Sequence, residues 1–249
     1  QDKGQGEMVV RAKYFIPAVG FAAQSYVPPW KGIESFRGEI YHSSSWPEGG
    51  VDVHGKQVAV IGTGATGVQI IQEWAKEAAE TVVFQRTPNL CCPMGQEKFD
   101  IPRQEEVIKG TADEFAACWT TTGGLPYGPP NKLFADYSRE ECEIALNTLY
   151  DKCGFYYWQG AYMDLLANPE GNRLAYDVWA KRTRVRIHDP VKRDLLAPLE
   201  PPHPFGTKRP CLEQDYYEQF NNPNVHIVDT SADPISEVVP EGIRTQSGK

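Results

Sequence analysis

The stretch that most constrains the fold of this chain is residues 57–67, Gln-Val-Ala-Val-Ile-Gly-Thr-Gly-Ala-Thr-Gly. The apolar run 58–61 predicts a fully buried strand, and three glycines then complete a G-x-G-x-x-G spacing where the strand should pass into a helix. The first glycine permits a tight turn, the second lets the backbone approach a pyrophosphate, and the third lets the helix pack closely on the strand. Free N–H groups at the helix start would face the phosphates. We therefore predict a dinucleotide site whose residues are Gly62, Thr63, Gly64, Ala65, Thr66, Gly67 and Gln69.

The residues after this turn predict a βαβ unit. A helix should run from the last glycine to about residue 79, with Val68, Ile71, Ala75 and Ala78 on one face. Residues 81–84 form the next apolar run, and they predict a second buried strand. This order of elements implies a parallel sheet with a right-handed crossover.

The end of the second predicted strand favours one nucleotide over another. NAD-binding proteins usually carry Asp or Glu there to hold the ribose 2′-hydroxyl, whereas this chain has Gln85, Arg86 and Thr87. An arginine pairs with a phosphate through two parallel hydrogen bonds, and no acid stands beside it to repel the phosphate. The pattern therefore predicts NADP(H), with a surface charge at a strand end as the alternative explanation of Arg86.

Bulk composition excludes several classes of protein. The net charge of −8 and the absence of a Lys/Arg run argue against a nucleic-acid partner, and no apolar run approaches the length of a membrane span. The six cysteines contain no C-x-x-C pair, which predicts a reduced, cytoplasmic setting and neither a zinc site nor a disulfide framework. The chain begins without Met, so we expect a piece of a longer protein.

The middle of the chain predicts a helical insertion. Residues 8–16 alternate and predict a strand or hairpin, whereas amphipathic patterns predict helices at 105–119, 138–152, 156–166 and 173–187. Because about a hundred residues are too many for an α/β connection, the insertion should occupy about 96–203. We expect Trp119, Trp158 and Trp179 in its core and Arg182, Arg184 and Arg186 on a solvated face.

The α/β pattern resumes after the insertion. A loop at 204–210 carries the adjacent cations Lys208 and Arg209. Residues 213–220 predict a short helix, 224–228 a strand, and 235–239 with 242–245 a strand pair. His226 on the apolar strand should be a core residue, and no histidine has the spacing of a metal ligand.

A second motif precedes the glycine-rich turn. It reads F-x-G-x-x-x-H-x-x-x-W-P and comprises Phe36, Gly38, His42, Trp46 and Pro47. Taken alone, such residues in a loop are most often structural. This pattern and its place before a G-x-G-x-x-G nevertheless resemble the fingerprint of Baeyer–Villiger monooxygenases. The resemblance also includes residues 83–88, 189–190, 204–209, 215–218 and 224–230, and so covers nearly the whole chain.

The resemblance implies an α/β, doubly wound Rossmann-type NADP-binding domain at 48–249 with the helical insertion. Residues 1–47 would hold the end of an FAD-domain segment and the linker with the fingerprint. In that family NADPH reduces FAD, the flavin captures dioxygen as a peroxyflavin, and a ketone becomes an ester or lactone. By resemblance Arg209 is the catalytic cation, Lys208, Arg86 and Thr87 hold the 2′-phosphate, and His42 couples the movement of the domains.

The chain also departs from that family. The FAD fingerprint, the acidic partner of the catalytic arginine and the C-terminal part are absent from the sequence, so we expect the chain alone to be inactive and to bind FAD weakly. Two other interpretations are an N- or S-oxygenating flavin monooxygenase and a non-catalytic NADP-binding module. A plain dehydrogenase is disfavoured, because no Tyr-x-x-x-Lys pair or metal ligand set accompanies the nucleotide site.

Overall fold

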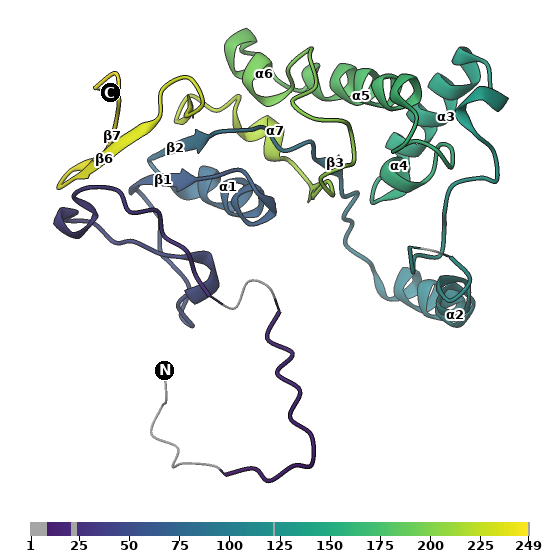
Figure 1. The fold of residues 1–249 in the computed structure, drawn as a ribbon, viewed down its shortest axis with the longest axis horizontal. Helices are drawn as coiled ribbons and strands as arrows, with labels where there is room; N and C mark the ends of the chain where they lie inside the picture. Colours follow the sequence, from purple (N-terminus) through teal and green to yellow (C-terminus); the bar gives the residue numbers. More distant parts are fainter. Residues whose placement is uncertain (1–8, 21–23, 122, 249) are drawn as a thin grey trace.

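A three-stranded parallel sheet forms the centre of the computed structural model, which describes residues 9–20, 24–121 and 123–248. Its strand order is β1 (Gln57–Ile61), β2 (Glu80–Gln85), β5 (Val225–Asp229), and β2 therefore lies in the middle. The register pairs Val60 with Val83 and Val83 with Ile227. Helix α1 (Ala65–Glu77) connects β1 to β2 and buries Val68, Ile71 and Ala75 against them (Figure 1). The predicted parallel α/β class is confirmed.

The predicted burial of the first strand is wrong. In β1 only Val60 is buried, and Ile61 is 48% exposed. The reason is that β1 is an edge strand and its alternate residues lie on the face away from α1. His226 on the opposite edge strand follows the same rule: its side chain is 48% exposed, and Nε2 lies 3.4 Å from Glu80 Oε1. The prediction of a core histidine is therefore also wrong.

A helical region separates β2 from β5, as the sequence predicted. It follows the short strand β3 (Cys92–Pro93), which pairs in parallel with β4 (Leu212–Glu213). The helix α7 (Tyr216–Gln219) then packs beside α1. The helices of the insertion are α2 (Ile101–Cys118), α3 (Arg139–Asp151), α4 (Tyr156–Gln159), α5 (Pro169–Arg184) and α6 (Pro190–Leu196).

Local chemistry explains where these helices begin and end. Helix α3 begins after Ser138, whose hydroxyl accepts from Glu141 N while the Glu141 carboxylate accepts from Ser138 N. Helices α5 and α6 begin with proline after the capping residues Asn168 and Asp189. The helix predicted at 156–166 ends after one turn, at Gly160.

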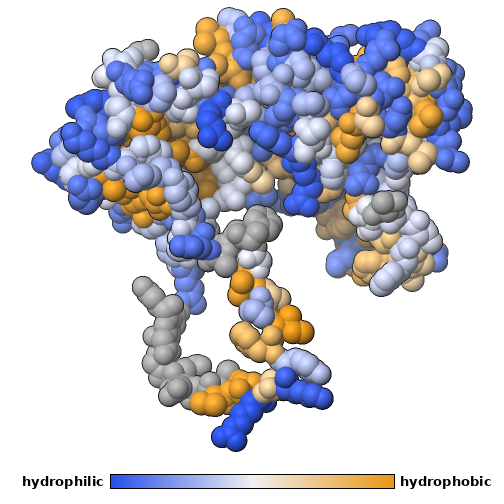
Figure 2. Space-filling view, in the orientation of Figure 1, coloured by the Kyte–Doolittle hydropathy of each residue, from blue (hydrophilic) through white to orange (hydrophobic). Residues whose placement is uncertain are grey.

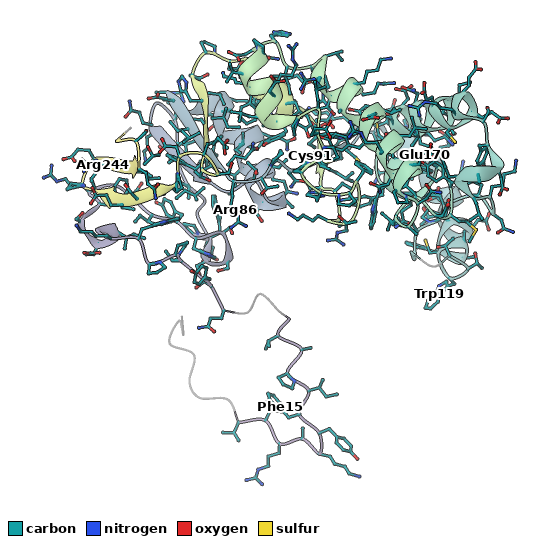
Figure 3. The ribbon with its side chains drawn as sticks, turned by 45° about the horizontal axis from the view of Figure 1, so that its top comes forward. Phe15, Arg86, Cys91, Trp119, Glu170 and Arg244 are labelled. Atoms are coloured by element: carbon teal, nitrogen blue, oxygen red, sulfur yellow. The ribbon has the colours of Figure 1, made fainter. Side chains whose placement is uncertain are left out.

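Two predictions about the side chains of the insertion are wrong. Trp179 is fully buried, but Trp119 is 91% exposed at the end of α2, a helix with no buried residue (Figure 3). Trp158 is half-buried and donates from Nε1 to Gly206 O at 3.1 Å. The arginines expected on a solvated face make ion pairs instead, and only 19% of the Arg186 side chain is exposed.

The N-terminal segment is extended over its described residues 9–20, where neither strand nor helix is assigned. The predicted strand or hairpin at 9–16 is therefore wrong, and Met8 lies outside the described residues. A strand needs a pairing partner, and this segment runs away from the body (Figure 1). Its apolar side chains are exposed, as the orange atoms in Figure 2 show.

The hairpin of β6 (Ile235–Val239) and β7 (Gly242–Thr245) has the predicted bounds. Short 3-10 helices at Ile33–Ser35, Ser43–Ser45 and Phe134–Asp136 complete the secondary structure. Val238 N donates to Lys31 O at 2.9 Å, which joins the hairpin to the segment before β1. Within the described residues no helix is long and apolar enough to cross a membrane.

Candidate functional site

A pocket of about 680 Å³ lies at the carboxyl ends of β1, β2 and β5. This edge of a parallel sheet is where open α/β folds bind their ligands. Segments far apart in the sequence line the pocket: residues 28–30, 61–65, 84–90, 203–209 and 230–235 each contribute. The pocket has the size of a cofactor site.

The glycine-rich turn forms one wall of this pocket. Gly62 has φ +95°, a conformation that favours glycine, and its N–H donates to Phe84 O at 2.9 Å. Gly64 is the N-cap of α1 and offers no side-chain cap, so the first N–H groups of the helix remain for a ligand. A Cβ at Gly67 would lie 2.2 Å from Gly62 O, which explains the third glycine of the motif.

The turn contributes four of its seven predicted residues to the lining: Gly62, Thr63, Gly64 and Ala65. Thr66, Gly67 and Gln69 do not line the pocket. Gly67 serves the site indirectly, because it lets α1 approach the turn that precedes it.

Hydrogen bonds fix the turn to the loop after β2. Thr63 Oγ1 donates to Thr87 O at 3.0 Å, and Asn89 Nδ2 donates to Thr63 O at 2.9 Å. Asn89 O in turn accepts from the hydroxyl of the fully buried Tyr217 at 3.0 Å. These hydrogen bonds therefore fix the positions of Arg86 and Thr87 relative to the glycine-rich turn.

Cations dominate the charged part of the lining. Arg86 comes from the end of β2, and Lys208 and Arg209 come from the loop after the insertion. His203 from the same loop also lines the pocket. None of the described lining residues is acidic, although the chain carries a net charge of −8. The site is therefore suited to an anionic ligand.

Sequence reasoning missed several lining residues. The place of Thr230 after β5 could have been inferred, because ligands of parallel sheets contact the ends of neighbouring strands. No such signal in the sequence pointed to Trp30, Pro234 and Ile235. Their position at the pocket depends on the backbone pairing of residue 31 with β6.

The fingerprint residues lie outside the pocket lining. His42 Nδ1 lies 2.7 Å from Ser44 Oγ and accepts from Ser44 N at 3.2 Å, so it caps a short 3-10 turn. The ring of Trp46 lies 5.8 Å from that of Trp74, and this contact joins the motif to α1. A Cβ at Gly38 would lie 2.6 Å from the Phe36 ring. Pro47 follows in the same segment, and its carbonyl accepts from Gly50 N at 3.0 Å.

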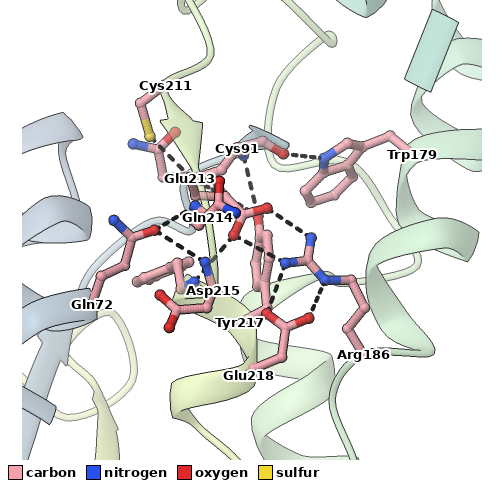
Figure 4. A network of polar contacts seen from close by, with 12 residues as sticks. Gln72, Cys91, Trp179, Arg186, Cys211, Glu213, Gln214, Asp215, Tyr217 and Glu218 are labelled. Carbon is pink, nitrogen blue, oxygen red and sulfur yellow. Dashed lines mark hydrogen bonds and ion pairs between the residues drawn. The ribbon is translucent and has the colours of Figure 1, made fainter. Parts of the chain in front are cut away.

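A buried polar network supports the loop that carries Arg209 (Figure 4). Both terminal nitrogens of Arg186 donate to the fully buried Glu213, at 2.7 and 3.0 Å, and Nε donates to Glu218 at 2.6 Å. Burial opposes the charge of Arg186, but its ion pairs with Glu218 and Glu213 outweigh this effect and raise its pKa. Burial raises the pKa of Glu213, and Arg186 partly offsets this. The network fixes the strand that begins three residues after Arg209.

Comparison with known proteins agrees with this geometry. Residues 6–92 match the model of the flavin-binding monooxygenase-like family. The chain is 41% identical over 246 residues to the FAD-binding monooxygenase acrE of Aspergillus aculeatus, covering 99% of this chain and 42% of that protein. It is 38% identical over 247 residues to cyclopentanone 1,2-monooxygenase of a Comamonas species, covering 98% and 44%.

A solved structure shows the same arrangement. The crystal structure of OTEMO complexed with FAD and NADP matches with a TM-score of 0.86 and 42% identity, over 93% of this chain and 44% of that one. The chain thus spans less than half the length of the relatives that it matches.

Proposed function

We propose that this chain is the NADP-binding part of a flavin monooxygenase of Baeyer–Villiger type, because almost its whole length is similar to less than half of several such monooxygenases. The proposal places the NADP-binding domain at 48–249, its insertion at about 96–203, and the end of an FAD-domain segment with the linker at 1–47. A reduced, cytoplasmic setting belongs to the proposal and rests on the cysteine spacing alone.

The observation that carries the proposal is the convergence of Arg86, Lys208 and Arg209 on the glycine-rich turn, with no acid among the described lining residues. A dinucleotide with a 2′-phosphate has two anionic parts that need such partners. The N-terminus of α1 suits the pyrophosphate, because its N–H groups lack side-chain caps. Arg86, Thr87 and Lys208 suit the 2′-phosphate, which a guanidinium binds through two donors.

In the whole enzyme, bound NADPH and FAD would together supply the reducing chemistry by which one oxygen atom of dioxygen enters beside a ketone carbonyl. This chain contributes positioning. The glycine-rich turn would hold the pyrophosphate, while the frame of Thr63 and Asn89 keeps Arg86 and Thr87 at a fixed place beside it. Arg209 would offer a permanently charged fork of donors to the negative charge that develops on oxygen at the flavin.

A nucleotide titration tests the proposal. We expect the protein to bind NADP+ more tightly than NAD+, and Arg86→Glu to remove that preference. Loss of a phosphate-paired arginine should cost about 1.5–3 kcal/mol, which is roughly ten- to a hundredfold in the Kd for NADP+. Binding of NAD+ should change little, because it has no 2′-phosphate.

Arg139→Glu is the matched control, because it makes the same change of charge on the exposed surface of α3. Equal weakening by both variants would show that net charge alone matters and would contradict the site. Product analysis of the full-length enzyme with ketone, amine and sulfide substrates then separates Baeyer–Villiger oxidation from N- or S-oxygenation. Failure of any longer form to oxygenate would favour a non-catalytic NADP-binding module.

A further inference from the structure

Two buried cysteines from segments next to the pocket-lining loops lie in contact with each other. Cys91 Sγ lies 3.1 Å from Cys211 Sγ, although 120 positions separate them in the sequence. Cys91 follows the loop that carries Arg86 and Asn89, and Cys211 follows Arg209 and Pro210. Figure 4 shows both residues beside the network of Glu213. Neither cysteine has a part in the proposed nucleotide chemistry.

The backbone holds this pair in register. Cys92 pairs with Leu212 in the β3–β4 ladder, and Cys92 N donates to Cys211 O at 2.9 Å. Cys91 and Cys211 therefore occupy neighbouring positions one residue before the ladder. Adjacent strands lie about 4.7–4.9 Å apart, and this spacing falls within the Cα separation that a disulfide accepts.

Cys91 is also fixed on its other side. Its N–H donates to the Tyr217 hydroxyl at 3.1 Å, and its carbonyl accepts from Trp179 Nε1 at 2.7 Å. Both partners are fully buried. The two sulfur atoms consequently face each other from a rigid setting, where a bond requires only a small movement of the side chains.

We propose that Cys91 and Cys211 form a reversible disulfide when a peroxide reaches the protein, and that this bond changes the affinity of the pocket for its nucleotide. In the first step the Cys211 thiolate attacks a peroxide oxygen, giving a sulfenic acid and releasing hydroxide (or an alkoxide, from an organic peroxide). In the second the Cys91 sulfur displaces the sulfenic oxygen, and water leaves with the Cys91 proton. Two thiols are thus oxidised by one peroxide, and a dithiol reverses the change.

The two cysteines differ in a way that suits these roles. Cys211 is 8% exposed, whereas Cys91 is fully buried. The hydrogen bond from Cys91 lowers the pKa of Cys211 despite its burial, so the less buried of the two residues also forms its thiolate more readily. Burial strongly raises the pKa of Cys91, which remains a thiol until the sulfenic acid has formed.

The expected consequence follows from the position of the bond. Forming it draws the two sulfurs from 3.1 Å to about 2.05 Å and covalently joins the two loops that carry the cations of the pocket lining. The backbone must absorb any part of this shortening that rotation of the side chains does not, and a displacement of a cation by up to about 1 Å is enough to disturb a fitted ligand. The bond would also close the chain segment that contains the whole insertion, so the oxidised form should unfold at a higher temperature.

Peptide mapping of the folded protein tests the proposal. After treatment with hydrogen peroxide, non-reducing mass spectrometry should show one cross-linked pair of peptides that contain residues 91 and 211, two hydrogens lighter than the reduced pair. Dithiothreitol should restore the free peptides. Cys92→Ser is the matched control, because Cys92 is fully buried next to Cys91 and should not be required. Cys91→Ser should abolish the bond, and dimedone should then label Cys211.

Mass spectrometry detects the disulfide whether or not a nucleotide binds. The disulfide proposal can therefore be refuted while the proposed NADP site stands. A cross-link that survives Cys91→Ser but is lost in Cys92→Ser would overturn the pairing. Absence of any cross-link, with both thiols alkylated only after unfolding, would overturn the proposal altogether. If the bond forms, the Kd for NADP+ should change at least threefold between the oxidised and reduced protein, and equal values would refute the link to the pocket.

Discussion

Replacing Arg186 by Met should destabilise the protein more than any comparable change of a surface arginine. The guanidinium is the shared partner of the fully buried Glu213 and the half-exposed Glu218. Removing one member of a buried ion pair typically costs about 3–5 kcal/mol, because the remaining charge is left without a partner. Glu218 adds little to this cost, since water can solvate its carboxylate. For a protein of this length the cost corresponds to a loss of about 6–20 °C in Tm.

The measurement is thermal and urea unfolding of the two forms, followed by tryptophan fluorescence at several pH values. Arg139→Met is the control, because among the described residues this arginine forms an ion pair with Glu143 alone, an exposed contact on the same helix worth about 0.2–0.5 kcal/mol. The double variant Arg186→Met with Glu213→Gln should recover much of the loss, because it removes the unpaired charge as well.

The loss of stability in Arg186→Met should be smaller at low pH than at high pH. Burial raises the pKa of Glu213, and loss of Arg186 removes the charge that opposes this rise. A carboxyl group whose pKa is higher in the folded state contributes stability at low pH and loses it as the pH rises through that pKa. The deficit of Arg186→Met should therefore shrink between pH 8 and pH 5. A pH-independent deficit, or one within 1 kcal/mol of that of Arg139→Met, would refute the reasoning.

Three further substitutions or measurements follow from the geometry. Gly67→Ala should weaken NADP+ binding and lower the Tm, since its Cβ would lie 2.2 Å from Gly62 O, and an unchanged Kd in an isothermal titration would contradict this. Ser138→Ala should cost about 1 kcal/mol in urea unfolding through loss of the α3 cap, and no change would argue against the capping box. In the native, reduced protein a thiol reagent should label Cys118 and Cys153 first, because the other four cysteines are buried, and uniform labelling would be incompatible with this core.

The sequence predicted the parts of the fold whose chemistry is local. The glycine spacing, the apolar face of α1 and the period-two pattern of β6 and β7 each depend on neighbouring residues, and the structure has these elements where they were expected. The same holds for the helix predicted at 138–152, which the structure has at Arg139–Asp151 with Ser138 as its N-cap. Arg86 could be picked out from its place at the end of β2, whereas the roles expected for Lys208 and Arg209 came from the family resemblance, and the structure brings all three residues into one pocket.

Most of the wrong predictions have a different origin. They concerned whether a side chain is buried, which depends on the parts of the chain that pack against it. The apolar run of β1 could not show that this strand lies at an edge, and the alternating arginines at the end of α5 and just after it could not show that two acids lie opposite Arg186. Trp119 is an aromatic residue of the kind that usually lies in a core, but α2 has no buried residue and Trp119 is exposed at its end. These properties depend on pairs of residues far apart in the sequence.

The placement of the pocket residues has the same long-range character. The glycine-rich turn is fixed to the β2 loop by Thr63 and Asn89, and Asn89 is fixed through Tyr217 to the helix α7. The ring of Tyr217 packs against Arg186, which binds Glu213 from the end of the insertion. Because a buried charge network contributes little net stability, its value lies in excluding other arrangements. We infer that the insertion braces the two loops that carry the cations, so a change at Arg186 should alter nucleotide affinity as well as stability.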